Sequence, residues 1–175
     1  MFFLIFQYLL GRKSKIILTE VFEIYIICKN KLEREMDVMK KIFVICSKAF
    51  YKDIPPIKER LEENGWEVYL PHTYDNPNAE NEWYAKGVEE HAKMKGEMFK
   101  RSRDRIKSMN AVLTLNFDKN GKKNYVGGST FLELYEAFME NKKIYLWNEI
   151  PEGILYDEIS GFAPEVINGN LDLVK

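Results

Sequence analysis

Cysteine and histidine are scarce in this 175-residue chain, which has two of each. Cys28 and Cys46 are too few for a disulfide framework or a cysteine-rich zinc site. His72 and His91 lie far apart in the sequence and lack the spacing of metal ligands, so we expect no metal site. Cys46 falls in an apolar strand, where a cysteine is typically a small core residue.

Three motifs of common α/β enzymes are also missing. The chain has no Gly-x-x-x-x-Gly-Lys-Ser/Thr phosphate loop, no Gly-x-Ser-x-Gly nucleophile elbow and no Gly-x-Gly-x-x-Gly dinucleotide fingerprint. These absences weaken the case for three frequent chemistries of α/β proteins. The sequence predicts no bound cofactor.

Charge of one sign is not in excess. Lys and Arg number 26 and Asp and Glu number 27, so no overall field attracts nucleic acid or an acidic membrane. The local exception is the run from Lys100 to Lys107, in which five of eight residues are basic. Either this run is the solvated face of a helix, which we favour, or it is a patch that faces phosphate groups. We do not expect a nucleic-acid partner.

Long hydrophobic runs are absent too. Residues 1–10 are apolar, but ten residues are too few to cross a bilayer. No positively charged segment precedes them and no small-residue cleavage site follows, so they fit a secretory signal poorly. A second apolar run, residues 16–28, is interrupted by Glu20 and Glu23. The sequence therefore predicts a cytoplasmic protein without a membrane partner.

The regular alternation of strands and helices begins only after residue 39. We therefore divide the chain into an N-terminal extension, residues 1–39, and one domain, residues 40–175. Met36 and Met39 follow Leu-Glu-Arg-Glu, whose codons can be as purine-rich as a ribosome-binding site. We expect translation to start at Met36 or Met39, with the preceding residues read in frame from upstream sequence. The alternative is a membrane-surface or oligomerisation arm.

The domain itself shows the pattern of a parallel α/β fold. Apolar runs of strand length predict strands at 41–46, 66–70, 111–115 and 143–147, with a last strand around 165–167. Helices are expected from 54 to Gly65, over 82–108 with possible divisions at Gly87 and Gly96, over 130–140, and near 155–159. The alternation predicts a flavodoxin-like or Rossmann-like three-layer fold with a five-stranded parallel sheet of order 2-1-3-4-5.

The segment between the third strand and the helix at 130–140 is the most informative about function. Open α/β sheets bind ligands at the carboxyl ends of their strands, and N–H groups at the start of a helix suit an anion or a sugar hydroxyl. Glu133 is expected in the first helical turn, facing whatever this loop holds. Its plainer role is a capping box with Thr130, in which the carboxylate only accepts the Thr130 N–H.

Four segments, taken in order, resemble the nucleoside 2-deoxyribosyltransferase-like family. They are residues 41–47, 61–71, 109–116 and 127–134, which read KIFVICS, LEENGWEVYLP, MNAVLTLN and GGSTFLEL. The resemblance implies a flavodoxin-like fold, a homo-oligomer, and an enzyme that cleaves or transfers the N-glycosidic bond of a nucleoside or nucleotide. Members of this family include nucleoside deoxyribosyltransferases and nucleotide N-hydrolases.

The resemblance assigns the nucleophile of that reaction to Glu133, which would hold the (deoxy)ribosyl group as an ester. A second family carboxylate would fall at Ser102. Asp104 is the candidate substitute, although on a helix its side chain projects about 200° away from that of residue 102. Tyr135 also stands where the family has glycine. The alternative is a non-catalytic nucleotide-binding or sensor domain of the same fold, which the serine at 102 favours.

The remaining candidates for binding a nucleoside or nucleotide lie where the first and third strands end and where the next helix begins. They are Ser47, Lys48, Asn116, Asp118, Tyr125, Gly127, Gly128 and Ser129. The polar side chains and glycine-led N–H groups suit phosphate or ribose, and Tyr125 is a candidate for stacking on a base. For each of these residues the plainer role is in a turn or in the core.

Overall fold

The computed structural model describes residues 21–26 and 39–175. The chain divides into two compact units, residues 1–39 and residues 40–175. Of the first unit, residues 21–26 are helical. The predicted start at Met36, and the residues just before it, lie outside the described residues. In the part of the chain that the structure describes, no helix has both the length and the apolar character needed to cross a membrane.

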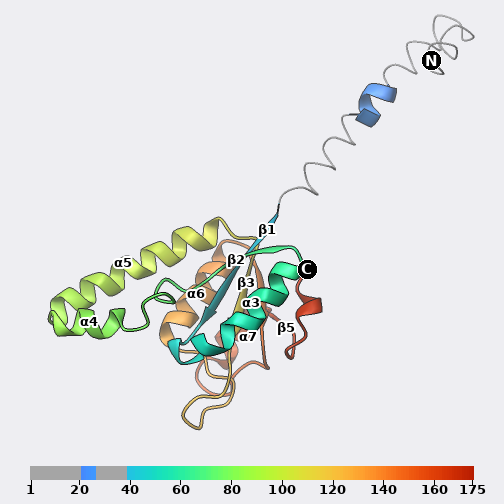
Figure 1. Cartoon of the computed structure of the whole chain (residues 1–175). Coiled ribbons are helices and arrows are strands. Elements are labelled where there is room, and N and C mark those ends of the chain that lie inside the picture. Colours follow the sequence, from blue (N-terminus) through green and yellow to red (C-terminus); the bar gives the residue numbers. More distant parts are fainter. Residues whose placement is uncertain (1–20, 27–38) are drawn as a thin grey trace, which may run out of the picture. The chain divides into compact units, whose positions relative to one another are not determined.

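A parallel sheet forms the middle layer of the second unit (Figure 1). Among the described residues its strands are β1 (Lys40–Cys46), β2 (Trp66–Tyr69), β3 (Ala111–Leu115), β4 (Lys143–Leu146) and β5 (Glu165–Val166). Their order is β2-β1-β3-β4-β5, which confirms the predicted three-layer flavodoxin-like fold. β1 and β3 are direct neighbours, and Cys46 at the end of β1 lies opposite Leu115 at the end of β3. The two central strands therefore end at the same level.

Helices cover both faces of this sheet. The described helical elements are η1 (Lys48–Asp53), α3 (Ile54–Glu63), α4 (Ala79–Ala85), α5 (Val88–Lys107), α6 (Gly128–Met139), α7 (Tyr156–Gly161) and η2 (Leu171–Leu173). On one face, Leu61 of α3 packs in a cluster with Val44 and Leu113. On the other, Leu134 of α6 packs in a cluster with Phe43, which also holds residues of α5 and α7. The central strands β1, β3 and β4 are buried over most of their length on both sides, as their continuous apolar sequences require, whereas the edge strands β2 and β5 are only partly buried.

The predicted helical region at 82–108 is two helices. Gly87 divides it, because this residue has a backbone φ of +114°, a conformation that glycine adopts without steric cost. Gly96 does not divide it and lies within α5. Figure 1 shows α4 lying beside the first half of α5, so that the two helices form a hairpin at one side of the sheet.

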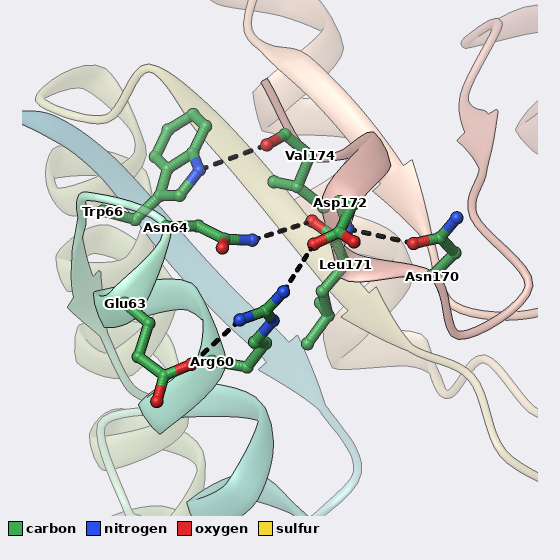
Figure 2. Close-up of polar contacts among 8 residues, drawn as sticks. All are labelled: Arg60, Glu63, Asn64, Trp66, Asn170, Leu171, Asp172 and Val174. Atoms are coloured by element: carbon green, nitrogen blue, oxygen red, sulfur yellow. Dashed lines mark hydrogen bonds and ion pairs between the residues drawn. The ribbon is translucent and has the colours of Figure 1, made fainter.

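The C-terminal segment closes the α3 face of the sheet. Figure 2 shows Trp66 donating a hydrogen bond from Nε1 to the carbonyl of Val174 (3.4 Å) and Asn64 donating from Nδ2 to the carbonyl of Leu171 (3.3 Å). The side chains of Leu171 and Val174 are buried in the same cluster as α3. The last residues of the chain are therefore part of the core.

We expect Leu171→Ala to lower the free energy of unfolding by about 2–3 kcal/mol, because it leaves a cavity in this cluster. Leu173→Ala, two residues away, is the matched control, since the Leu173 side chain is exposed. Its effect should stay within about 0.5 kcal/mol. Urea unfolding followed by circular dichroism measures both variants, and equal losses would contradict a core role for Leu171.

Candidate functional site

A cavity of about 270 Å³ lies at the carboxyl ends of β1 and β3. After β1 the chain turns toward α3 on one face of the sheet, whereas after β3 it turns toward α6 on the other face. This divergence opens a crevice between the two strands, which is where ligands bind in open α/β sheets. The cavity is lined by the turn after β1, the loop after β2, the α4–α5 hairpin, the loop after β3 and the start of α6.

The start of α6 presents free backbone donors to this cavity. Gly127 is the N-cap residue, and no side chain caps the helix there. The ring of Tyr125 folds over Gly127, where an added Cβ would lie 3.0 Å from the tyrosine oxygen. A larger residue at position 127 would therefore have to displace the Tyr125 side chain from the cavity wall. The first N–H groups of a helix have no partner within the helix, so the Gly128–Thr130 turn can receive an anion.

Lys119 brings a positive charge to the same cavity. Its ammonium group donates a hydrogen bond to the hydroxyl of Ser47 (2.9 Å) and lies 4.6 Å from the centre of the Tyr125 ring. These contacts connect the loop after β3 to the turn after β1. Sequence reasoning did not select Lys119, because nothing in the spacing of the loop distinguishes it from Lys122 and Lys123.

The charged side chains around the cavity give it a net positive charge. Lys48, Lys95 and Lys119 line it, against the two carboxyl groups of Glu80 and Glu133, so three charges minus two leave +1 when both carboxyls are ionised. Lys95 of α5 forms an ion pair with Glu80 of α4, which neutralises both. The remaining lysines are then balanced only by Glu133, and protonation of that group raises the net charge to +2.

Glu133 titrates near neutral pH. Burial raises the pKa of its carboxyl group from 4.5 to about 7, against the opposing effects of the Ser102 hydrogen bond and the Lys95 and Arg105 charges. The hydroxyl of Ser102 donates to Glu133 Oε1 at 2.8 Å. Both protonation states are therefore populated at pH 7, so the group can donate a hydrogen bond to a ligand or accept one.

The alternative capping role of Glu133 does not fit this structure. α6 begins at Gly128, so Thr130 is inside the helix rather than at its N-cap, and its side chain is buried. The glutamate carboxylate contacts Ser102 of α5 instead. The helix starts two residues earlier than the sequence predicted, because Gly128 and Ser129 are already helical and Gly127, with an extended backbone, is the N-cap.

Two other titratable groups on the cavity wall stay uncharged at neutral pH. Burial, then the charges of Glu133 and Asp53, raise the pKa of the Cys46 thiol to about 12, so it is a poor nucleophile. Burial, then the charge of Arg105, lower the pKa of His72. Over residues 21–26 and 39–175, no three or more His, Cys, Asp or Glu side chains are placed to hold a metal ion.

The structure brings most of the predicted site residues to this cavity. Those that line it are Ser47, Lys48, Tyr125, Gly127, Gly128, Ser129 and Glu133. Several lining residues were not predicted as site residues, namely Cys46, Tyr51, His72, Thr73, Glu80, Lys95, Met98 and Lys119. Most of these come from the loop after β2 and from the α4–α5 hairpin, whose position over the sheet edge has no sequence signature.

Asn116 and Asp118 do not line the cavity. The Asn116 side chain is buried, accepts the N–H of Asn148 (2.8 Å) and donates to the carbonyls of Asn148 (3.1 Å) and Glu149 (2.9 Å). It therefore fastens the end of β3 to the chain after β4. Asp118 accepts the N–H of Asn124 (3.0 Å) and shapes its own loop. Both are structural residues in this geometry.

Asp104, the predicted second carboxylate, is also absent from the cavity wall. Its side chain is 78% exposed and lies 3.8 Å from the ammonium group of Lys107. Ser102, two residues earlier on α5, is the residue that faces Glu133. The helical rotation between positions 102 and 104 separates the two side chains, so Asp104 cannot act as the second carboxyl group beside Glu133.

Four of the five basic side chains in the run from Lys100 to Lys107 are exposed on α5. Lys100 pairs with Glu97 at 2.8 Å and Arg103 lies 3.3 Å from Glu136, and both basic side chains are more than half exposed. Arg105 turns inward and donates to the carbonyl of Leu70. This is the geometry of a solvated helix face, the interpretation that we favoured from the sequence.

Comparisons with known proteins add little. No family model matches the chain, and no curated protein sequence matches it significantly. Among solved structures, it is similar to FerB, a flavoenzyme NAD(P)H:(acceptor) oxidoreductase from Paracoccus denitrificans. The two share 17% sequence identity over 73% of this chain and 74% of FerB, with a TM-score of 0.40. A likeness of this degree concerns the fold and gives this chain no chemistry.

The expected function is corrected by these findings. No family model and no curated sequence supports a glycosidic activity, and the structural neighbour FerB is named as an oxidoreductase. The cavity also has Ser102 where the second carboxylate was required. N-glycosidic bond cleavage or transfer is therefore withdrawn as the function of this chain, with the transferase and hydrolase assignments. The family resemblance itself stays a prediction.

The raised pKa of Glu133 predicts a specific dependence of stability on pH. The folded state holds this proton up to about pH 7, whereas the unfolded chain releases it near the ordinary value of 4.5. The stabilising contribution of the Glu133 proton to the free energy of unfolding is therefore fully present below pH 4.5. It is lost as the pH rises to about 7, and it changes no further above that pH. Its upper limit is roughly 3 kcal/mol.

Urea unfolding at about pH 5 and at about pH 8 tests this dependence. We expect the wild-type protein to lose more stability between these values than Glu133→Gln, which has no proton to release. Glu59→Gln on α3 is the control and should keep the wild-type difference. Identical pH dependences for the wild-type protein and Glu133→Gln would contradict the shifted pKa.

Proposed function

We propose that the cavity binds a small phosphate-bearing molecule, with a mononucleotide as the ligand class. The observation that carries this proposal is that the uncapped start of α6 and the ammonium group of Lys119 face one cavity at the ends of β1 and β3. Backbone N–H groups at a helix start and a nearby lysine are a common way to bind phosphate.

The charge of the cavity supports an anionic ligand. Lys95 and Glu80 neutralise each other, and the remaining cations, Lys48 and Lys119, exceed the charge of a half-ionised Glu133. A dianionic phosphate would restore balance. The hydroxyl of Ser47, which already accepts a hydrogen bond from Lys119, can donate its own proton to a phosphate oxygen.

The size and lining of the cavity support a ligand no larger than a mononucleotide. Its volume of about 270 Å³ is near the lower end of ligand pockets, roughly 300–1,000 Å³, and a dinucleotide needs more room. The cavity is also lined by Tyr51, His72 and Met98, whose rings and thioether suit a planar heterocycle. We also propose a cytoplasmic location, because a nucleotide ligand and the free thiol of Cys46 both suit a reducing compartment.

Titration calorimetry with a ligand panel tests this proposal. The panel consists of the nucleoside monophosphates, flavin mononucleotide, the corresponding unphosphorylated compounds and inorganic phosphate. We expect at least one mononucleotide to bind roughly tenfold or more tightly than its unphosphorylated form, since hydrogen bonds to a charged group contribute about 1.5–3 kcal/mol. Equal affinities for the two forms would disprove phosphate recognition.

Lys119→Ala should weaken binding of that mononucleotide about tenfold or more, because it removes a charge-assisted hydrogen bond from the phosphate site. Lys122→Ala is the matched control, since Lys122 belongs to the same loop but does not line the cavity. Its affinity should equal that of the wild-type protein. Equal losses of affinity in both variants would show that the lysines of this loop act only through their overall positive charge and not through a contact with the phosphate.

A further inference from the structure

The outward face of α6 is apolar. Leu132, Tyr135, Phe138 and Met139 are 43%, 44%, 43% and 55% exposed. Leu132, Tyr135 and Met139 recur at positions i, i+3 and i+7, so they form one stripe along the helix. The opposite side of the same helix is buried in the core through Leu134 and Ala137. α6 is therefore hydrophobic on both its inner and its outer side.

α3, on the other face of the sheet, shows how this protein builds a solvated helix. Its buried side carries Ile57 and Leu61. Its outward side carries Lys58 and Glu62, which form an ion pair at 2.8 Å, together with exposed Glu59. The contrast between the two layers indicates that the outer side of α6 is not adapted to water.

The apolar surface continues from α6 onto α7. The Phe162 ring, just after α7, lies 6.3 Å from that of Tyr135 and 5.2 Å from that of Phe138. Tyr156 at the start of α7 is 48% exposed. The Phe162 ring thus contacts the two rings of α6, and Tyr156 adds exposed aromatic surface on α7. They make one patch, the α6–α7 patch, rather than scattered exposed residues, and such patches mark interaction sites.

We propose that the α6–α7 patch is the interface of a symmetric homodimer, in which α6 packs against α6 of a second copy of this chain. Charge favours this partner. At the α5 edge of the patch, Arg103 lies 3.3 Å from Glu136, so this part of the patch has no net charge. Apolar side chains beside such a neutral edge can face their own copy without repulsion there, whereas they offer no complement to a strongly charged partner.

The area of the patch also suits a dimer. A large side chain presents on the order of 200 Å² when fully exposed, so the four α6 residues together offer roughly 350–400 Å². A standard interface buries about 800 Å² on each partner, of which about 57% is apolar, or roughly 450 Å². The four α6 side chains with Phe162 and Tyr156 supply that apolar share. This inference stands independently of the proposed ligand.

Sedimentation of the full-length protein at micromolar concentrations tests the interface. We expect the wild-type protein to be a dimer. Leu132→Glu should weaken dimerisation about tenfold or more, because a carboxylate within the interface must be desolvated. Val88→Glu is the matched control, since Val88 is an exposed apolar residue at the start of α5, outside the patch. It should dimerise as the wild-type protein does.

Circular dichroism establishes that the variants are folded, and Tyr135→Ser, a milder change in the same stripe, replaces Leu132→Glu if the latter unfolds. A wild-type protein that is monomeric over the whole concentration range would overturn the proposal. So would an unchanged dimer in both Leu132→Glu and Tyr135→Ser, since the contact would then involve another surface. Weakened dimers in the patch variants together with an unaffected Val88→Glu would support it.

Discussion

The site depends on one constraint, the direct pairing of β1 with β3. Because the two strands are parallel and in register, they end at the same level, and the chain leaves them toward opposite faces of the sheet. Neither of these two connections crosses the crevice between the strand ends, because they leave toward opposite faces. The turn after β1, the loop after β3 and the start of α6 therefore border one open cavity. Every residue assigned to the proposed phosphate site comes from these three segments.

α6 combines three roles along twelve residues. Its first turn faces the cavity, its inner side fills the core and its outer side forms the apolar patch. Gly127, the N-cap, favours the first role, because the Tyr125 side chain lies close to where a Cβ at position 127 would be. Glu133 lines the cavity, and its carboxyl group also accepts a hydrogen bond from Ser102 of α5. Its burial raises the pKa of its carboxyl group to about 7, which makes the charge of the cavity depend on pH around neutrality.

The corrections to the sequence-based expectations share a physical origin. Asn116 and Asp118 were expected to meet a ligand because they follow a strand at the sheet edge. A strand end, however, fixes only where the backbone stops, and the side chain of Asn116 turns to the chain after β4. Asp104 was expected to replace a missing carboxylate, but two residues on a helix are separated by about 200°. Ser102 thus faces Glu133, while Asp104 is in solvent.

By itself, the sequence determined the fold class, the strand positions and the sheet order, because continuous apolar runs separated by helical patterns permit few arrangements. It also identified the turn after β1 and the glycine-led start of α6 as parts of a site. Tertiary structure decided what completes the cavity. Lys95 and Glu80 come from the α4–α5 hairpin, and Lys119 comes from a loop with three similar lysines. Such placements depend on how distant segments pack, and a local sequence pattern does not record long-range packing.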